Sequence, residues 1–284
     1  MKLKLAFSTC PNDTFIFDAL VNGRISKRSE LSFDILLADI QELNEIAIKA
    51  EADIVKISFA IYPLVSRNYQ LLTSGAALGK GVGPLLISKR KIYPDEIKYT
   101  RIAIPGENTT ANLLFTLAYP DAMQKQTYLF STIEEVVLAN EADVGVIIHE
   151  NRFTYQKKGL KKIMDLGEFW VKLSGLPIPL GGIAIKRYLP ETVKKEINTL
   201  ISHSVKFAMD NPSKSINYVQ SHAQTMDVEV MQQHIKLYVN NFTQDLKEIG
   251  QLAINELFSR AMASGFYKSI DIQNPIFIEH SKLE

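Results

Sequence analysis

The feature that most constrains this chain is an order of short apolar strands and helical stretches that occurs twice. Strand and helix alternation at this spacing predicts a parallel sheet with right-handed crossovers. Five matching elements predict two similar lobes. The first set is Leu3–Phe7, Asp13–Val21, Phe33–Leu37, Ile40–Ala50 and Ile54–Ile57, and the second is Arg101–Ile104, Ala111–Ala118, Thr127–Phe130, a helix opening at Ser131, and Val144–Ile148.

Two local details accompany this repeat. Glu51-Ala52-Asp53 precedes the third strand of the first set, and Glu141-Ala142-Asp143 precedes the third strand of the second. The tripeptide could be coincidence, because acidic helix ends before apolar strands are common, so the order of elements is the stronger argument. Ser131 with Glu134 three places on is a capping-box pattern and predicts where the last helix of the second set begins.

The segments between and after the two sets predict how the lobes are connected. Leu85–Ser88 is expected to be a strand leading out of lobe one, and Leu180–Ile185 a return strand. Gly75–Pro84 holds four glycines but lacks the final Lys-Ser/Thr of a phosphate loop, so it is expected to be a connector or a flexible cleft edge. Four helices should follow Pro190, over Glu191–Asp210, Ser213–His222, Asp227–Tyr238 and Thr243–Ala263.

These crossings predict a two-lobed α/β fold in which one lobe is inserted into the other. Lobe one is expected to comprise residues 1–91 and 178–284, including the C-terminal helices, and lobe two residues 92–177. In parallel α/β sheets, ligands collect at the carboxyl ends of the strands. The two sets of strand ends should therefore face a cleft that can close on a small molecule.

Composition narrows the class of protein further. The 284 residues are 46% apolar and 22% charged, with a formal net charge of +1, so nothing favours nucleic acid or an anionic membrane as a partner. One cysteine, Cys10, excludes an intramolecular disulfide. No secretion signal is visible, and no run approaches the ~20 apolar residues of a membrane span. We expect a soluble cytoplasmic protein, with the oligomeric state left open.

His149 is the sharpest candidate for catalysis. The apolar residues of Val144–Ile148 lead into it, so its imidazole should lie where a buried strand ends at the cleft. A neutral histidine there could accept a proton near neutral pH. The alternative is a hydrogen-bonded structural histidine, in which case Glu150 and Asp13 are the next candidates for a base. The remaining histidines are interpreted as surface or packing residues: His203, His222, His234 and His280.

Other strand-end residues suit the binding of an anionic small molecule. Thr109 and Thr110 precede an apolar helix, where free amides and hydroxyls could hold a carboxylate or could simply cap the helix. Asn12 and Thr14 raise the same two possibilities in lobe one, where Asp13 would compete with an anion.

The end of the third strand in lobe one offers a further set of candidates. Lys56 could meet an anionic substrate or pair with an acidic side chain, and Ser58 corresponds by pseudo-symmetry to His149. No glycine-flanked nucleophile elbow supports a serine hydrolase. No metal-ligand spacing occurs, and we expect neither a metal nor a cofactor.

At these residues the sequence resembles the 1,4-dihydroxy-6-naphthoate synthase family of the futalosine route to menaquinone. The resemblance covers nearly the whole chain, and one departure is Ser8-Thr9-Cys10-Pro11 where the family usually has Ser-Pro-Cys-Pro. The similar segments are Ser8–Phe17, Lys56–Ser58, Gly75–Pro84, Thr109-Thr110, Ile147–Tyr155, Asp165–Gly167 and Gly175–Pro177.

The resemblance implies a type II periplasmic-binding-protein fold used for catalysis. It implies cyclic dehypoxanthine futalosine as substrate and dihydroxynaphthoate as product, with the histidine matching His149 abstracting a proton from carbon. It also implies that Lys56, Ile57, Ser58, Thr109 and Thr110 line the ligand site. Two alternatives stay open: a sister enzyme of the pathway acting on chorismate, and a non-catalytic solute-binding protein.

Overall fold

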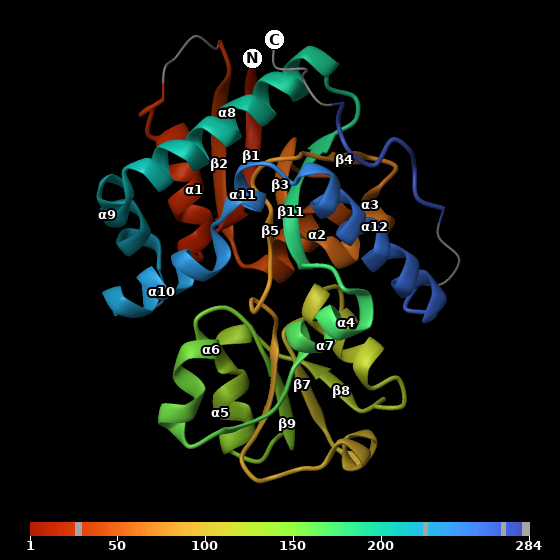
Figure 1. Ribbon diagram of the computed structural model, residues 1–284. Helices are drawn as coiled ribbons and strands as arrows, with labels where there is room; N and C mark the ends of the chain where they lie inside the picture. The colour runs from red at the N-terminus through yellow and green to blue at the C-terminus, as the bar shows by residue number, and fades with distance from the viewer. Residues whose placement is uncertain (26–29, 224–226, 268–270, 280–284) are drawn as a thin grey trace.

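The computed structural model describes residues 1–25, 30–223, 227–267 and 271–279. Their strands form two sheets, one in the upper and one in the lower body of Figure 1. We call the upper body lobe one and the lower body lobe two. Among the described residues, no helix combines the length and apolar character that a membrane crossing requires.

The sheet of lobe one has the strand order β2-β1-β3-β11-β4, with β5 pairing to β11. β1 is parallel to both β2 and β3, whereas β11 is antiparallel to β3, β4 and β5. The parallel strands alternate with helices, as their sequence spacing predicts. The elements are β1 (Lys2–Ser8), α1 (Pro11–Val21), β2 (Ser32–Ala38), α2 (Ile40–Ile48), β3 (Ile54–Ser58), η1 (Phe59–Ile61), α3 (Tyr62–Val65), β4 (Tyr69–Leu71), β5 (Ala77–Gly79) and β11 (Ile178–Lys186).

The sheet of lobe two has the order β8-β7-β9-β6-β10, which repeats the order of lobe one strand for strand. β7 is parallel to β8 and β9, and β6 is antiparallel to β9 and β10. The predicted pseudo-equivalence of the lobes is therefore present in the sheets. The elements are β6 (Leu85–Ser88), η2 (Pro94–Tyr99), β7 (Ile102–Ile104), α4 (Thr110–Ala118), β8 (Lys125–Thr127), η3 (Phe130–Thr132), α5 (Ile133–Leu138), β9 (Val144–Ile147), α6 (Asn151–Thr154), η4 (Tyr155–Lys158), β10 (Lys161–Asp165) and α7 (Leu166–Ser174).

Two expectations for lobe two are corrected. The strand Leu85–Ser88, assigned above to lobe one, is β6 and pairs with β9 and β10, so the chain enters the second sheet before residue 92. Local periodicity identifies a strand but cannot say which sheet it joins. The expected capping box is also wrong: α5 has Thr132 at its N-cap with no side-chain cap, and Glu134 instead pairs with Lys158 at 2.7 Å.

The two chain crossings lie side by side, because β5 and β11 are hydrogen-bonded neighbours where they leave lobe one (Figure 1). The glycine-rich segment after β5 packs against the start of α7. A Cβ on Gly83 would lie 2.2 Å from the backbone nitrogen of Gly167, so only glycine fits there. This close contact, rather than a phosphate site, accounts for glycine at that position of the connector.

The C-terminal helices pack back onto lobe one, as the sequence predicts. α8 and α9 contact α1, and α10 covers the same helix from the side nearest lobe two (Figure 1). The last expected helix is divided in two near Asp245. The bounds are α8 (Glu191–Asp210), α9 (Pro212–His222), α10 (Val228–Tyr238), α11 (Asn241–Gln244) and α12 (Lys247–Ala263), while His280 lies outside the described residues.

Candidate active site

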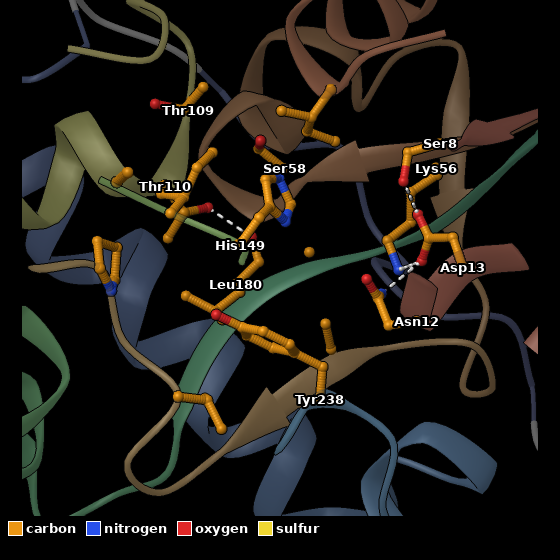
Figure 2. Close-up of a pocket in the computed structure, with 17 residues that line it drawn as sticks. Ser8, Asn12, Asp13, Lys56, Ser58, Thr109, Thr110, His149, Leu180 and Tyr238 are labelled. Carbon is orange, nitrogen blue, oxygen red and sulfur yellow. Dashed lines mark hydrogen bonds and ion pairs between the residues drawn. The ribbon is translucent and has the colours of Figure 1, made fainter. Parts of the chain in front are cut away.

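A cavity lies between the two lobes at the carboxyl ends of the parallel strands. Its volume is about 80 Å³, and both lobes and the crossing strand β11 contribute to its wall (Figure 2). The predicted residues that border it are Asn12, Lys56, Ser58, Thr109, Thr110 and His149, and it is completed by Ser8, Asp13, Ile40, Ala77, Val82, Pro84, Ala111, Ile148, Leu180, Gly181 and Tyr238.

Two of the predicted binding residues do not border this cavity. The Ile57 side chain is fully buried in the sheet core. The Thr14 hydroxyl donates to the carbonyl of Cys10 at 3.1 Å, inside the first turn of α1. α1 begins at Pro11, earlier than the sequence pattern indicates, and this places Thr14 within the helix rather than ahead of it.

His149 follows β9 and adopts a positive φ of 55°, which turns the chain at the cavity wall. The Phe130 ring meets the imidazole edge-on, with the ring centroids 4.9 Å apart. The Nε2 of His149 is buried and has no hydrogen-bond partner among the described residues. Burial lowers the pKa of the imidazole, against the opposing effect of the Glu150 and Asp13 carboxylates. A neutral imidazole with a free nitrogen can accept a proton.

Lys56 and Asp13 form a buried ion pair beside the cavity, with Nζ 2.8 Å from Oδ1 (Figure 2). Asp13 also accepts hydrogen bonds from the Ser8 hydroxyl at 2.7 Å and from the Asn12 amide at 2.8 Å. Lys56 therefore has an acidic partner within the protein, which was one of the two sequence-based interpretations. The pair leaves this wall of the cavity without a net charge.

The hydroxyls of Thr109 and Thr110 both form hydrogen bonds within the protein. Thr109 is the N-cap of α4, since its hydroxyl accepts from the Asn112 amide at 3.2 Å. The Thr110 hydroxyl donates to the Leu180 carbonyl at 2.7 Å and accepts from the Ala60 amide at 3.2 Å, and it thereby ties α4 to lobe one (Figure 2). The first-turn amides of a helix have no partner within the helix, so this end of α4 suits an anion.

Two buried polar residues that were not predicted from the sequence, Asn44 and His234, support the site. Asn44 on α2 accepts from the Ser58 amide at 2.9 Å and donates to the Ser58 hydroxyl at 3.1 Å, which fixes Ser58. His234 on α10 is fully buried and stacks on His149. For both residues, the signal available in the sequence was a polar side chain on the apolar face of a predicted helix. Of the two sequence-based interpretations of His234, surface or packing, the second applies, and the residue packs beside the site.

Cys10 is not suited to act as a nucleophile. Burial, with the nearby Glu150 and Asp13 carboxylates, raises the pKa of its thiol well above the usual value. A protonated thiol is a poor nucleophile. Within the described residues, no group of three or more His, Cys, Asp or Glu side chains is arranged to hold a metal ion.

The fold and the interlobe site define a class of two-lobed proteins that share the fold of periplasmic binding proteins. The alkanesulfonate-binding protein SsuA from Xanthomonas axonopodis pv. citri superimposes with a TM-score of 0.74 at 11% identity, covering 97% of each chain. A solved protein from Archaeoglobus fulgidus superimposes with a TM-score of 0.88 at 34% identity, covering 94% of this chain and 98% of the other. The first similarity concerns the fold alone.

The sequence comparisons identify the family. Residues 3–263 match the family described as "Menaquinone biosynthesis", and the chain belongs to it. It is similar to a 1,4-dihydroxy-6-naphtoate synthase of Streptomyces coelicolor, at 41% identity over 94% of this chain and 95% of that protein. It is also similar to the protein of that name from Thermus thermophilus, at 38% identity over 97% and 99% of the two chains. Both the enzyme class and the fold expected from the sequence are confirmed.

Proposed function

We propose that this protein is a carbon–carbon lyase that converts cyclic dehypoxanthine futalosine to 1,4-dihydroxy-6-naphthoate in the cytoplasm, with His149 as the general base. The observation that carries the proposal is the unpartnered Nε2 of His149 at the wall of the interlobe cavity, within the described part of the chain. The base takes a proton from a substrate carbon, and the electron pair of that C–H bond drives cleavage of a carbon–carbon bond. The second fragment leaves with the electron pair of the broken bond and is protonated, and formation of the aromatic product favours completion.

One incubation tests the reaction. Purified protein is mixed with cyclic dehypoxanthine futalosine, and the products are followed by mass spectrometry. Dihydroxynaphthoate should accumulate over many turnovers. Chorismate serves as the control substrate: its consumption, with futalosine derivatives unchanged, would indicate the sister activity, and binding without turnover of either compound would indicate a solute-binding protein.

The acid side of the pH profile should report His149. Burial disfavours the imidazolium, so protonation requires a lower pH than for an exposed histidine. We therefore expect the acid limb of kcat/KM to have its midpoint below the ordinary histidine value of about 6.5. The measurement is kcat/KM from about pH 5 to pH 9, since this parameter reports the free enzyme. A midpoint above the ordinary value would mean that Glu150 and Asp13 outweigh burial.

The substrate carboxylate is proposed to bind at the N-terminus of α4, next to Ser58. Because the Thr110 hydroxyl joins α4 to the Leu180 carbonyl and the Ala60 amide, Thr110→Val should loosen this end of the helix. We expect a rise of about tenfold in the substrate dissociation constant, consistent with the loss of one or two hydrogen bonds of about 1 kcal/mol each. Thr110→Ser, which keeps the hydroxyl, is the control. If calorimetry finds wild-type affinity for Thr110→Val, the carboxylate binds elsewhere.

Substrate entry requires the lobes to separate. The cavity volume of about 80 Å³ is far below the roughly 300–1,000 Å³ of ordinary ligand pockets, so the site must widen to admit the substrate. Hinge motion at the paired crossings β5 and β11 would open it. Small-angle X-ray scattering should show a smaller radius of gyration with saturating dihydroxynaphthoate than without ligand. Identical profiles under the two conditions would contradict hinge closure.

A further inference from the structure

His234 is a buried histidine in the second layer of the site. It lies on α10, is fully buried, and does not border the cavity. α10 packs on α1 of lobe one, whereas His149 and Glu150 follow β9 of lobe two. Any contact of His234 with these two residues therefore spans the cleft, and separation of the lobes would break it.

The hydrogen bonds around Asn12 determine which nitrogen of His234 carries the proton. The Asn12 Nδ2 donates to the Asp13 carboxylate at 2.8 Å, so its Oδ1 is the atom that faces His234. Because Oδ1 can only accept, the Nε2 of His234, 2.8 Å away, must donate. This bond fixes the plane of the imidazole, and in the neutral form it leaves the lone pair on Nδ1.

The other edge of His234 faces lobe two. Its Nδ1 lies 3.8 Å from the Oε2 of Glu150, and neither atom has a hydrogen-bond partner among the described residues. The distance is too long for a hydrogen bond. Burial, together with the neighbouring His149, lowers the pKa of His234 well below its usual value, so the ring is neutral. A neutral ring adds no positive charge beside His149 when His149 takes a proton.

The faces of the two imidazoles are stacked. The His149 and His234 ring centroids lie 5.8 Å apart with an angle of 13° between the planes, and Phe130 contacts His149 at a steep angle. Phe130 belongs to lobe two and stays with His149 in any open state, whereas His234 arrives with lobe one. The orientation of the His149 ring in the closed cavity thus depends on a residue of the opposite lobe.

We infer that His234 is a positioning residue for His149: its ring, held by Asn12, forms the wall against which the base is aligned when the lobes close. The inference rests on the proposed role of His149 as the base. Catalysis is sensitive to such alignment, since a displacement of about 1 Å can cost about 10²-fold in rate. The effect should fall on kcat, because His234 does not contact the ligand.

Three variants of His234 separate the contribution of its ring to kcat from that of its hydrogen bond to Asn12. His234→Ala removes both, and we expect kcat to fall by about 10- to 100-fold with KM within about twofold of wild type. His234→Phe keeps an aromatic face without the bond to Asn12 and should restore part of kcat. His234→Gln keeps a donor for Asn12 but no ring, and should remain close to His234→Ala. His203→Ala, on the exposed side of α8, is the matched control and should leave kcat unchanged.

These measurements test the role of His234 separately from the role of His149 as the base. Wild-type kcat in folded His234→Ala, or equal losses in the Phe and Ala variants, would overturn the role of the ring while leaving His149 as the base. Activity surviving in a His149 variant would instead overturn the base. Should the His234 variants not fold, ¹⁵N-histidine NMR of the wild-type product complex still tests the geometry: His234 should be the Nε2–H tautomer, and an Nδ1–H tautomer overturns the arrangement.

Discussion

His149→Asn should retain ligand binding and lose turnover by about 10²- to 10⁴-fold, the usual contribution of a general base. Asparagine is a better replacement than alanine because of the backbone conformation at this position. At a φ of 55°, asparagine is tolerated, whereas alanine is strained. The variant should therefore fold with a near-native melting temperature. The measurement is kcat from the formation of dihydroxynaphthoate, with product affinity determined in parallel.

A matched control and a contradicting outcome accompany this prediction. His222→Asn, on the distant helix α9, should have wild-type kcat. If His149→Asn turned over substrate at the wild-type rate, His149 would be a structural histidine, and Glu150 and Asp13 would be the next residues to test. A variant that binds product normally and fails to react leaves the general base as the explanation.

Lys56→Met should lower the free energy of unfolding by about 3–5 kcal/mol, the cost of removing one partner from a buried ion pair. The side chains of Lys56 and Asp13 are 5% and 2% exposed, so little water reaches the carboxylate that loses its partner. Methionine keeps most of the volume, so the variant removes the charge together with the hydrogen bond that Nζ donates to the Gly75 carbonyl at 3.2 Å. Equilibrium unfolding in urea, without ligand, measures the difference.

The double variant Lys56→Met, Asp13→Asn is the control for uncompensated charge. It should recover part of the loss, because no buried carboxylate is left without a cation, while the oxygen of the introduced amide can still accept a hydrogen bond. Lys206→Met, from an exposed i,i+4 pair with Asp210, should change stability by less than about 1 kcal/mol. Unfolding of Lys56→Met at the wild-type urea concentration would show that the buried pair contributes little.

The sequence by itself determined the succession of elements and the duplication. Strand and helix periodicities are local, so β1, β3, β7 and β9 could be placed from their apolar runs alone. The rule that ligands collect at the carboxyl ends of parallel strands then selected Ser58 and His149, which do border the cavity. The family resemblance gave these positions a reaction, and the comparisons confirm the family.

Only the tertiary structure decided how distant segments combine. β6 joins the second sheet because of partners that follow it in the chain, and no local pattern contains that information. The Lys56–Asp13 pair and the His234–Asn12 bond each join residues far apart in sequence. A histidine on the apolar face of a helix has the same local signature whether it packs in a core or supports a base. The residues that surround the histidine across the cleft determine which of these two roles it has. Those residues belong to the other lobe, so only the packing of the two lobes brings them to it.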